Sequence, residues 1–584
     1  MSDNAPGPVA DRELTHVRID GAGKQALEVC RTRLVVAAGL FALAFLGLAV
    51  RLVSVGLFDV GDGQPQARMT AQSAPLVQRA DIVDRNGVLL ATNLDVHSLF
   101  ADARLIEDPK AVAARLAQTL TGIEPTVLEA KLSSGRGFVW IKRGLAPRQV
   151  YAINRLGIPG LSFVPEQRRT YPAGSLAAHV VGQTDIDNRG ISGIENRFDD
   201  TLRASPTTPL ALTLDIRFQH VLHEELAAAV DTFKALGAAG VIIDVANGEV
   251  VAMVSLPDFD PNRALRPTDD NVRFNRASHG VYEMGSTFKA FTIAMALDAG
   301  TVGISDGYDA SKPLRLARFT IRDFHAQNRW LSVPEIFMHS SNIGAAKMAL
   351  DVGAEGQQTF LTRLGLLTPA QIELPEVGAP LFPSRWRDVN VATIGFGHGI
   401  AVSPLQLAAA TAALVNGGTL HHPTLVRRDP SASNVNARPP SARVISTKIS
   451  YRMRQLFRLV VEQGTGRRAD VPGYPVGGKT GTAEKSNENG YDSNRLLSSF
   501  VGAFPINNPR YVVFAAIDEP KGTKETKGYA TGGWTAAPVV GRVVSRIGPM
   551  VGLEPVTLTP PRDVAGNEPL LVTPDGVEIR LASF

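Results

Sequence analysis

A serine and a lysine, three residues apart, are the first residues in this sequence whose spacing suggests chemistry. Gly285-Ser286-Thr287-Phe288-Lys289 opens a segment that predicts a helix running to Leu297 and ending at Gly300. At this spacing the Ser286 and Lys289 side chains share one helix face. A serine hydroxyl becomes a nucleophile when a neighbouring base takes its proton. An amine is such a base only if burial or a second cation disfavours its ammonium form. Alone, the pair more often means an N-capping serine beside an exposed lysine.

Two further polar elements lie downstream. Ser340-Ser341-Asn342 follows an apolar stretch, and Lys479-Thr480-Gly481-Thr482 lies on a predicted strand. Ser340 follows Ser286 by 54 residues, and Lys479 follows Ser340 by 139. Alone, the first element could be a helix N-cap and the second an ordinary edge strand. The three elements in this order form a known signature of enzymes with an active-site serine.

With these elements the chain resembles the class B penicillin-binding proteins, which share the signature with class A β-lactamases. The resemblance runs from about residue 79 to about residue 550. It departs from the family pattern at Ala80, where glycine is usual. The combination most resembles the division-specific (septal) transpeptidase of alphaproteobacterial type. The other matching segments are Arg79 with residues 81–87, then residues 169–174, 190–195, 256–262, 397–406 and 532–538.

The resemblance implies a peptidoglycan D,D-transpeptidase. In this mechanism Ser286 attacks the carbonyl between the two terminal D-alanines of a stem peptide, and Lys289 takes its proton. Ser340 bridges Lys289 and Lys479 and passes a proton to the leaving amine. Asn342 orients Lys289 and bonds the substrate amide, whereas Lys479 keeps Lys289 neutral and attracts the substrate carboxylate. Backbone N–H groups of the nucleophile and of the third element form the oxyanion hole. The substrate-binding residues are expected to be Thr480, Gly481 and Thr482.

The resemblance also implies partners. An amine from a neighbouring strand attacks the ester on Ser286, and β-lactam antibiotics trap the same residue. Donor and acceptor stem peptides, a lipid-II glycan polymerase and other divisome membrane proteins are the expected partners. No His, Cys and Glu cluster has ligand spacing, so we expect neither a metal nor a cofactor. The net charge of +4 is scattered, which gives no support for nucleic-acid binding.

Other functions share parts of this pattern. A class A β-lactamase carries a catalytic glutamate in a Glu-x-x-Leu-Asn context, and no such string occurs between residues 343 and 478. A D,D-carboxypeptidase needs efficient water access, which the sequence does not exclude. A β-lactam-sensing receptor needs cytoplasmic signalling domains, for which residues 1–33 are too short. Within the family, an elongation-specific transpeptidase is the nearest alternative.

An apolar segment near the N-terminus predicts a membrane anchor. Residues 34–58 contain one charge, Arg51, and as a helix they could cross a hydrocarbon core about 30 Å thick. Basic residues before the segment and acidic residues after it put the N-terminus in the cytoplasm and the catalytic part in the periplasm. The alternative is a cleaved signal peptide, since small-x-small triplets occur at residues 42–44 and 54–56. Cys30 is the sole cysteine, so no intrachain disulfide is expected.

The elements that must position the three motifs indicate an α/β domain. A predicted helix at 217–236 precedes two apolar strands that are joined at Asn247-Gly248. Helical segments then occupy residues 285–463, including a buried helix and loop at 399–426. Because strands return after this helical middle, one sheet should take strands from both ends. By resemblance it is an antiparallel sheet flanked by helices, as in serine β-lactamases. The strands are expected at 238–245, 249–254, 474–484, 498–506 and 510–518, and a last helix at 534–548.

The segment before this domain predicts a separate α+β pedestal. Asn86-Gly87 indicates a hairpin turn, because both residue types accept positive φ. Residues 102–132 have helical spacing, and residues 165–203 are rich in predicted loops. Residues 484–497 and 518–531 are expected to be exposed loops or a mobile gate. The expected divisions are a cytoplasmic tail (1–33), a transmembrane helix (34–58), a stalk (59–78), the pedestal or dimerisation domain (79–206), the transpeptidase domain (207–555) and an irregular tail (556–584).

Overall fold

The computed structural model describes residues 33–50, 78–263, 269–427, 441–487, 490–555, 570–572 and 578–580. The chain divides into two units, Met1–Pro75 and Leu76–Phe584. In the first unit the described part is one helix, Arg33–Val50, which by length and composition could cross a membrane. The rest of the predicted anchor, Cys30, the tail before residue 33 and most of the stalk lie outside the described residues.

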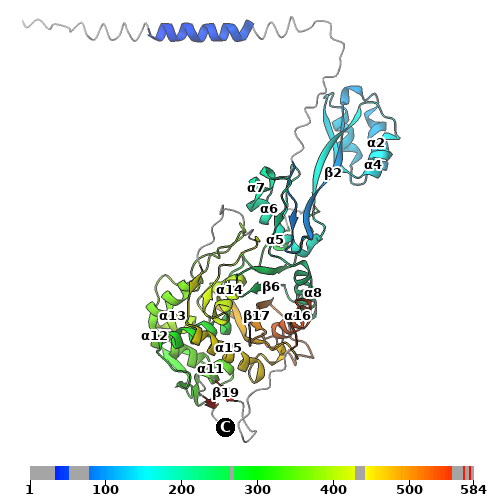
Figure 1. The fold of residues 1–584 in the computed structure, drawn as a ribbon. Helices are drawn as coiled ribbons and strands as arrows, with labels where there is room; N and C mark the ends of the chain where they lie inside the picture. Colours follow the sequence, from blue (N-terminus) through cyan, green and yellow to red (C-terminus); the bar gives the residue numbers. More distant parts are fainter. Residues whose placement is uncertain are drawn as a thin grey trace, which may run out of the picture. The chain divides into compact units, whose positions relative to one another are not determined.

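The larger unit is built on a five-stranded sheet in the order β16-β17-β18-β6-β7. Figure 1 labels β6 and β17 of this sheet. Every neighbouring pair is antiparallel. β6 and β7 precede the helical middle of the domain and the other three strands follow it, as the sequence predicts. β6, β7 and β18 are almost wholly apolar and buried, because helices cover both faces of the sheet there. The strands are β6 (Gly237–Asp244), β7 (Val250–Leu256), β16 (Gly477–Asn487), β17 (Gly490–Phe504) and β18 (Tyr511–Asp518).

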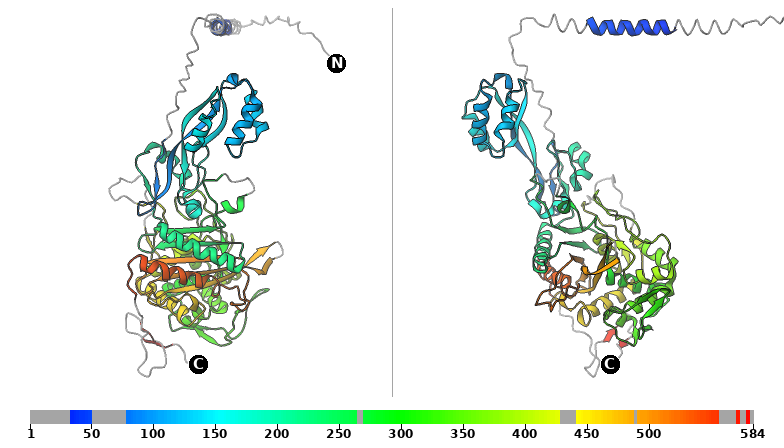
Figure 2. Two further views of the ribbon diagram at one scale, coloured as in Figure 1. Left: turned by 90° about the vertical axis from the view of Figure 1, so that its right-hand side faces the viewer. Right: turned by 180° about the vertical axis from the view of Figure 1, so that it is seen from behind.

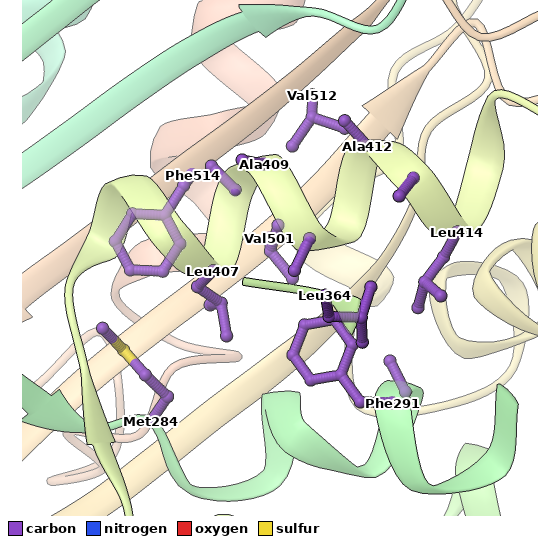
Figure 3. Packing of buried hydrophobic residues seen from close by; sticks show 14 of the residues in the cluster. Met284, Phe291, Leu364, Leu407, Ala409, Ala412, Leu414, Val501, Val512 and Phe514 are labelled. Atoms are coloured by element: carbon purple, nitrogen blue, oxygen red, sulfur yellow. The ribbon is translucent and has the colours of Figure 1, made fainter. Parts of the chain in front are cut away.

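Helices pack on the two faces of this sheet. α8 (Ile216–Phe233) and α16 (Ala536–Met550) lie side by side over one face and share a core with it (Figure 2). On the other face, α14 (Pro404–Val415) packs against Val501, Val512 and Phe514 of the strands (Figure 3). α14 is buried on every side, which explains its almost uninterrupted apolar sequence. The other helices of this domain include α10 (Lys289–Ala299), α11 (Val333–Met338), α12 (Asn342–Arg363), α13 (Asp388–Ile394) and α15 (Thr447–Glu462).

The pedestal is organised around one long strand, β2, which pairs antiparallel with β1, β3 and β4. Three helices, α2, α3 and α4, pack against part of this sheet and enclose a small apolar core of their own. The helices α5, α6 and α7 follow β4. The pedestal elements are β1 (Ile82–Val83), β2 (Leu89–Ala101), α2 (Pro109–Thr119), α3 (Pro125–Leu132), β3 (Val139–Leu145), α4 (Pro147–Asn154), β4 (Leu161–Thr170), α5 (Ala178–Val181), α6 (Gly193–Arg197), α7 (Asp199–Ala204) and β5 (Leu210–Ala211).

The turn between β1 and β2 differs from the prediction. Among its residues only Gly87 has positive φ, +84°, whereas Asn86 does not. The Asp84 N–H donates to the Val88 carbonyl at 2.8 Å, so the turn contains three residues rather than two. The Asp84 carboxylate also accepts the N–H groups of Asn86 and Val88, at 2.7 and 2.9 Å. A glycine at the last position of a three-residue hairpin loop fits this geometry.

The helical spacing of residues 102–132 is confirmed: the segment forms a short 3-10 turn and two helices, because Gly122 adopts φ +76° and Pro125 begins a new helix. Three other local expectations need correction. Residues 165–203 include the second half of β4, which pairs with β2 along its full length, and three short helices. The polar segment 484–497 continues β16 and β17 as a hairpin, since strand pairing there overrides its loop-like composition. The tail includes a described antiparallel pair, β19 (Leu570–Val572) and β20 (Glu578–Arg580).

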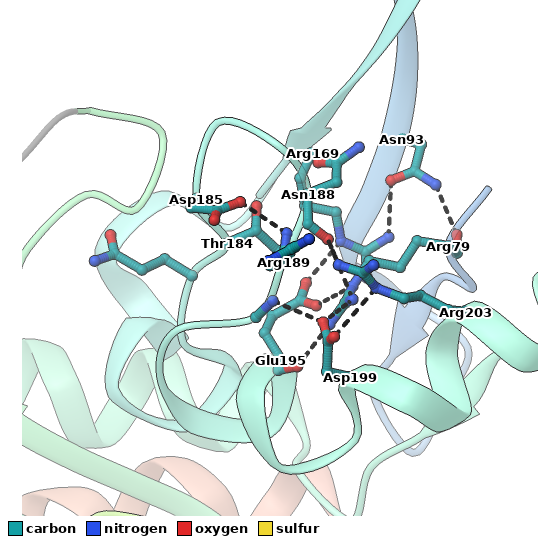
Figure 4. Close-up of polar contacts among 12 residues, drawn as sticks. Arg79, Asn93, Arg169, Thr184, Asp185, Asn188, Arg189, Glu195, Asp199 and Arg203 are labelled. Atoms are coloured by element: carbon teal, nitrogen blue, oxygen red, sulfur yellow. Dashed lines mark hydrogen bonds and ion pairs between the residues drawn. The ribbon is translucent and has the colours of Figure 1, made fainter. Parts of the chain in front are cut away.

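A buried network of charges ties the pedestal segments together (Figure 4). Arg79 donates to the Glu195 carboxylate at 2.6 Å and to Asp199 at 2.5 Å. Arg169 donates to the other carboxylate oxygen of Glu195, also at 2.6 Å. The Arg79 and Glu195 side chains are fully buried and that of Arg169 nearly so. These residues come from three of the segments that resemble the family outside the serine motifs, and their contacts give those segments a structural role.

Candidate active site

The first motif forms a tight turn that leads into α10. Gly285–Phe288 is a 3-10 helix, and Lys289 is the first residue of α10. Gly285 has φ +53°, and a Cβ there would lie 2.6 Å from the Thr482 carbonyl oxygen, so only glycine fits. This turn places the Lys289 Nζ 3.0 Å from the Ser286 Oγ. The two side chains therefore meet as the i, i+3 spacing predicts.

The second motif lies in a turn between α11 and α12. Ser341, rather than Ser340, is the N-cap of α12, because its hydroxyl accepts the Gly344 N–H at 3.0 Å. Ser340 has left-handed backbone geometry, with φ +61°. Its carbonyl accepts a hydrogen bond from Lys289, and its Oγ lies 3.1 Å from the same Nζ. Asn342 completes the contacts of this amine, with its Oδ1 2.7 Å from the Lys289 Nζ.

The third motif brings a second amine to the same place. Lys479 projects from β16, and its Nζ lies 2.9 Å from the Ser340 Oγ. The Ser340 hydroxyl thus lies within hydrogen-bond distance of both lysine amines. Lys289 and Lys479 are both fully shielded from solvent. The structure therefore brings together Ser286, Lys289, Ser340, Asn342 and Lys479 from three distant parts of the chain.

Burial lowers the pKa of both amines. The pKa of Lys289 lies well below its usual value, mainly because burial penalises the ammonium form and further because Lys479 is nearby. The Asp323 carboxylate opposes this shift by raising the pKa of Lys289. Burial alone lowers the pKa of Lys479 to about 7. A neutral Lys289 amine has a lone pair, so it can accept the Ser286 hydroxyl proton as a base must.

The strand residues after Lys479 are held by neighbours within the chain. The Thr480 and Thr465 hydroxyls lie 2.7 Å apart. The Thr482 Oγ1 accepts the Gly532 N–H at 3.1 Å, from another segment that resembles the family. A Cβ on Gly481 would lie 2.4 Å from the Ser499 Oγ and 2.6 Å from the Met284 carbonyl oxygen. Glycine at position 481 therefore allows a close approach to Ser499 and Met284 within the protein.

Sequence reasoning missed residues that support the motifs. Asp323 accepts the Ser341 hydroxyl at 2.7 Å and the Ile343 N–H at 2.9 Å, so it fixes the start of α12. The Arg322 carbonyl accepts the Asn342 side-chain amide at 2.9 Å. Thr465 follows α15 and reaches the third motif. No motif or periodicity marks these positions, and only the three-dimensional contacts reveal them.

A second polar cluster adjoins the nucleophile turn. Glu283, three residues before Ser286, accepts the Gly399 N–H at 2.8 Å and the Tyr491 hydroxyl at 2.9 Å with the same oxygen, Oε1. The His398 ring stacks on the Tyr491 ring, with centroids 5.4 Å apart. Burial, and then the nearby Lys289, lower the pKa of His398 to about 4. His398 is therefore neutral at neutral pH and lies close enough to Lys289 to sense its charge.

The described part of the chain contains no group of three His, Cys, Asp or Glu side chains that could hold a metal ion. The polar groups that gather around Ser286 are amines, hydroxyls and amides. Such a set suits proton transfer to and from a serine nucleophile. The arrangement can therefore activate the Ser286 hydroxyl, stabilise negative charge with Lys479 and return a proton through Ser340.

Comparison with known proteins identifies the two parts of the chain. The penicillin-binding protein transpeptidase domain matches residues 238–545, and the penicillin-binding protein dimerisation domain matches residues 75–208. A probable peptidoglycan D,D-transpeptidase, FtsI, of Caulobacter vibrioides is 40% identical over 90% of this chain and 89% of its own length. The peptidoglycan D,D-transpeptidase FtsI of Escherichia coli K12 is 29% identical, over 89% and 92% of the two chains.

A solved structure shows the same fold. The penicillin binding protein 3 of Mycobacterium tuberculosis, complexed with aztreonam, superposes with a TM-score of 0.66 at 24% identity. The match covers 82% of this chain and 97% of that one. The transpeptidase match alone spans more than half of the sequence, and the Caulobacter relative matches most of it. With the serine motifs gathered in one site, the chain thus belongs to the class B penicillin-binding proteins, which combine a dimerisation and a transpeptidase domain.

Proposed function

We propose that the protein is a peptidoglycan D,D-transpeptidase that crosslinks stem peptides during septal cell-wall synthesis. The observation that carries this proposal is the continuous set of contacts from Ser286 through Lys289 and Ser340 to Lys479. The relatives from Caulobacter and Escherichia coli are named as transpeptidases of this type, and their similarity extends through both domains. The expected domain divisions at residues 79, 207 and 555 remain part of the proposal.

The proposed acylation starts at the nucleophile. Neutral Lys289 takes the Ser286 proton while the oxygen attacks the carbonyl between the two terminal D-alanines. Backbone N–H groups of Ser286 and Thr482 receive the negative charge that develops, and one such donor is commonly worth about 2.7–4 kcal/mol. Ser340 passes the proton to the leaving D-alanine, since its hydroxyl lies within reach of both lysines. Lys479, with Thr480 and Thr482, binds the substrate carboxylate.

The second half-reaction transfers the peptide to an amine. An acceptor amine of a neighbouring stem peptide attacks the ester carbon, the C–N bond forms, and Ser286 regains its proton through Lys289. A β-lactam resembles the D-Ala-D-Ala end and leaves a stable ester on Ser286. Gly481 contributes to substrate binding indirectly. Because it has no side chain, β16 can lie against the nucleophile turn and present Thr480 and Thr482 to the substrate.

The proposal includes a membrane anchor near the N-terminus. The helix Arg33–Val50 is long and apolar enough to anchor the protein in the inner membrane. The charge bias of the sequence places the N-terminus in the cytoplasm and the catalytic domain in the periplasm. At the septum the protein would work with a lipid-II glycan polymerase and other membrane proteins of the divisome.

Labelling with a fluorescent penicillin tests the nucleophile. Ser286→Ala should abolish covalent labelling, whereas Ser545→Ala, an exposed serine on α16, should leave it intact. Peptide mapping of the labelled wild-type protein should place the adduct on Ser286. Labelling that persists in Ser286→Ala would move the nucleophile to another residue.

Depletion in cells tests the septal assignment. Loss of the protein should block division and give filamentous cells, because septal crosslinking stops while elongation continues. Complementation with Ser286→Ala should fail, and complementation with Ser545→Ala should succeed. Rounded cells after depletion would favour the elongation-specific alternative.

A further inference from the structure

One carboxylate beside the nucleophile has an oxygen that no described residue satisfies. The Oε1 of Glu283 accepts two hydrogen bonds, but its Oε2 is shielded from solvent and has no partner among the described residues. Burial raises the pKa of this carboxyl. A buried carboxylate oxygen without a hydrogen-bond partner costs free energy, because it has lost its contacts with water. Such a group therefore points to a ligand that could satisfy it.

Three segments of the active-site region meet at Glu283. Its own strand, β8 (Tyr282–Glu283), leads directly into the turn that holds Ser286. Gly399 belongs to the segment Gly397-His398-Gly399. The carbonyl of Gly397 in this segment accepts the Gly285 N–H. Tyr491 belongs to the end of the β16–β17 hairpin, whose other strand carries the third motif. The carboxylate is thus held against the nucleophile turn by contacts from two sides.

The hairpin side chain can uncover the carboxylate. Tyr491 is 52% exposed, and its hydroxyl contact to Glu283 joins the hairpin end to the nucleophile strand. A movement of this one side chain would remove a hydrogen bond from Oε1 and open that side of the carboxylate, and no described hydrogen bond joins Tyr491 to Lys289 or Lys479. A cation with N–H donors would satisfy both oxygens of the opened group.

We propose that Glu283 binds the ammonium group of the incoming acceptor and takes its proton before the amine attacks the acyl-enzyme. This inference rests on the proposed function, because it concerns the second half of the same reaction. An alkylammonium has no free electron pair, so the acceptor must lose a proton before it becomes a nucleophile. Lys289 and Lys479, which act in the first half-reaction, already contact the Ser286 and Ser340 hydroxyls.

The proposed step balances in atoms and charge. The acceptor ammonium gives one proton to the Glu283 carboxylate and becomes a neutral amine. Its electron pair forms the C–N bond at the ester carbon while the bond to the Ser286 oxygen breaks. The second proton leaves the nitrogen and returns to Ser286 through Lys289. The Glu283 carboxyl then releases its proton to solvent, which restores the starting state.

Other charged groups near the cluster fit this role less well. Glu484 lies near Tyr491, within the β16–β17 hairpin. No described contact connects the Glu484 side chain with the nucleophile turn. His398 has a pKa of about 4 and is a weak base. Burial and the nearby Lys479 lower the pKa of Lys289, which favours the neutral amine, and a neutral amine does not repel an incoming ammonium. Glu283 is therefore the carboxylate that an acceptor can meet beside Ser286.

A partition experiment tests the proposal on the full-length protein in detergent. A thioester analogue of the donor peptide acylates the enzyme, and the acyl group then goes to water or to an added nucleophile. D-alanine is an ammonium ion at neutral pH, whereas hydroxylamine is uncharged. For Glu283→Gln, the ratio of amide to hydrolysed product with D-alanine should fall about a hundredfold or more, in the range of general base catalysis. The ratio with hydroxylamine should change by less than about twofold, because hydroxylamine needs no prior deprotonation.

Tyr491→Phe is the matched control. It removes one of the two contacts of Glu283 but leaves the carboxylate, so the D-alanine ratio should be retained. If the product ratio fell equally with D-alanine and with hydroxylamine in both variants, Glu283 would have only a structural role, and the proposal would be overturned. A wild-type protein that is acylated but forms no amide with D-alanine would also overturn it. Failure of the wild type to form any acyl-enzyme would instead contradict the proposed function, so the two failures are distinguishable.

Discussion

At the scale of single residues, the two buried lysines should control how acylation depends on pH. Lys289 must be neutral to act as a base, so acylation should increase with pH through the lowered pKa of Lys289. Lys479 must be charged, so acylation should decrease as pH passes its pKa of about 7. We therefore expect a bell-shaped profile of the second-order acylation constant with a fluorescent penicillin. The acid limb depends on both amines, because the pKa of Lys289 is lowered further by the nearby Lys479.

Substitution of one lysine should move the limb of the other. Lys479→Gln removes a neighbouring positive charge, so the pKa of Lys289 should rise and the acid limb should move to higher pH. The rate should also fall severely, and the alkaline limb near pH 7 should disappear. His398→Gln is the control, because His398 is already neutral over this range and both limbs should remain. If the acid limb did not move in Lys479→Gln, the charge of Lys479 would have no effect on the pKa of Lys289.

Ser340 combines a strained backbone with the central hydroxyl of the site. Left-handed geometry costs a residue with a side chain roughly 1–2 kcal/mol, which glycine avoids. Ser340→Gly should therefore unfold at a higher temperature than Ser340→Ala, although both variants lose most of their acylation rate. Thermal unfolding and penicillin labelling of the two variants check this prediction. A lower melting temperature for the glycine variant would show that the backbone at residue 340 is not strained.

At the scale of elements, the site depends on the close approach of β16 to the turn before α10. Gly481→Ala would place a Cβ 2.6 Å from the Met284 carbonyl oxygen and 2.4 Å from the Ser499 Oγ, so the strand must shift away from Ser286. Misplacement by about 1 Å can cost on the order of a hundredfold in rate. We expect Gly481→Ala to lose that much of its acylation rate. The measurement is the acylation constant, with Gly528→Ala as a control in open space.

The control at Gly528 has one further use. Gly528 has φ +80°, so alanine there adds backbone strain without a steric contact. Gly481 has no positive φ, so alanine there adds no such strain. Similar losses in both variants would mean that the loss at Gly481 is not specific to the approach of β16. A rate at Gly481→Ala close to that of the wild type would mean that the strand tolerates displacement.

The same elements show what the sequence could predict about the site. Ser286 and Lys289 lie on consecutive turns, so their contact follows from local geometry, and the pairing of β6 with β7 follows from their apolar runs. Thr465 and Asp323 could not be predicted, because they reach the motifs through tertiary contacts that no periodicity encodes. Residues 484–487 were expected in a loop because they are polar, yet their pairing with β17 keeps them in a strand. Local patterns predict most helices and strands. Whether a polar segment forms a strand depends on its pairing with a neighbouring strand.

At the scale of the whole catalytic unit, a shared apolar cluster, hydrogen bonds and an ion pair join the pedestal to the transpeptidase domain. The Gly193 N–H donates to both Glu376 carboxylate oxygens, at 3.1 and 3.3 Å. Arg85 and Glu249 form an ion pair at 2.8 Å. Gly193 lies two residues before Glu195, whose carboxylate holds Arg79 and Arg169. The charge network inside the pedestal is therefore directly linked to the surface that faces the catalytic domain.

Breaking this network should destabilise the pedestal and leave the catalytic chemistry intact. Glu195→Gln removes the buried carboxylate and leaves two buried guanidinium groups without its charge, which commonly costs about 3–5 kcal/mol. Asp187→Asn removes an exposed partner of Arg143 and should cost less than about 1 kcal/mol, because solvent screens that pair. Chemical unfolding followed by circular dichroism should show an early transition for the Glu195 variant. Penicillin labelling of that variant below this transition should keep the wild-type acylation constant, since no residue of the network contacts Ser286 or Lys289 among the described contacts. If the acylation constant fell while the fold remained intact, the network would have to transmit an effect to the active site through Gly193 and Glu376.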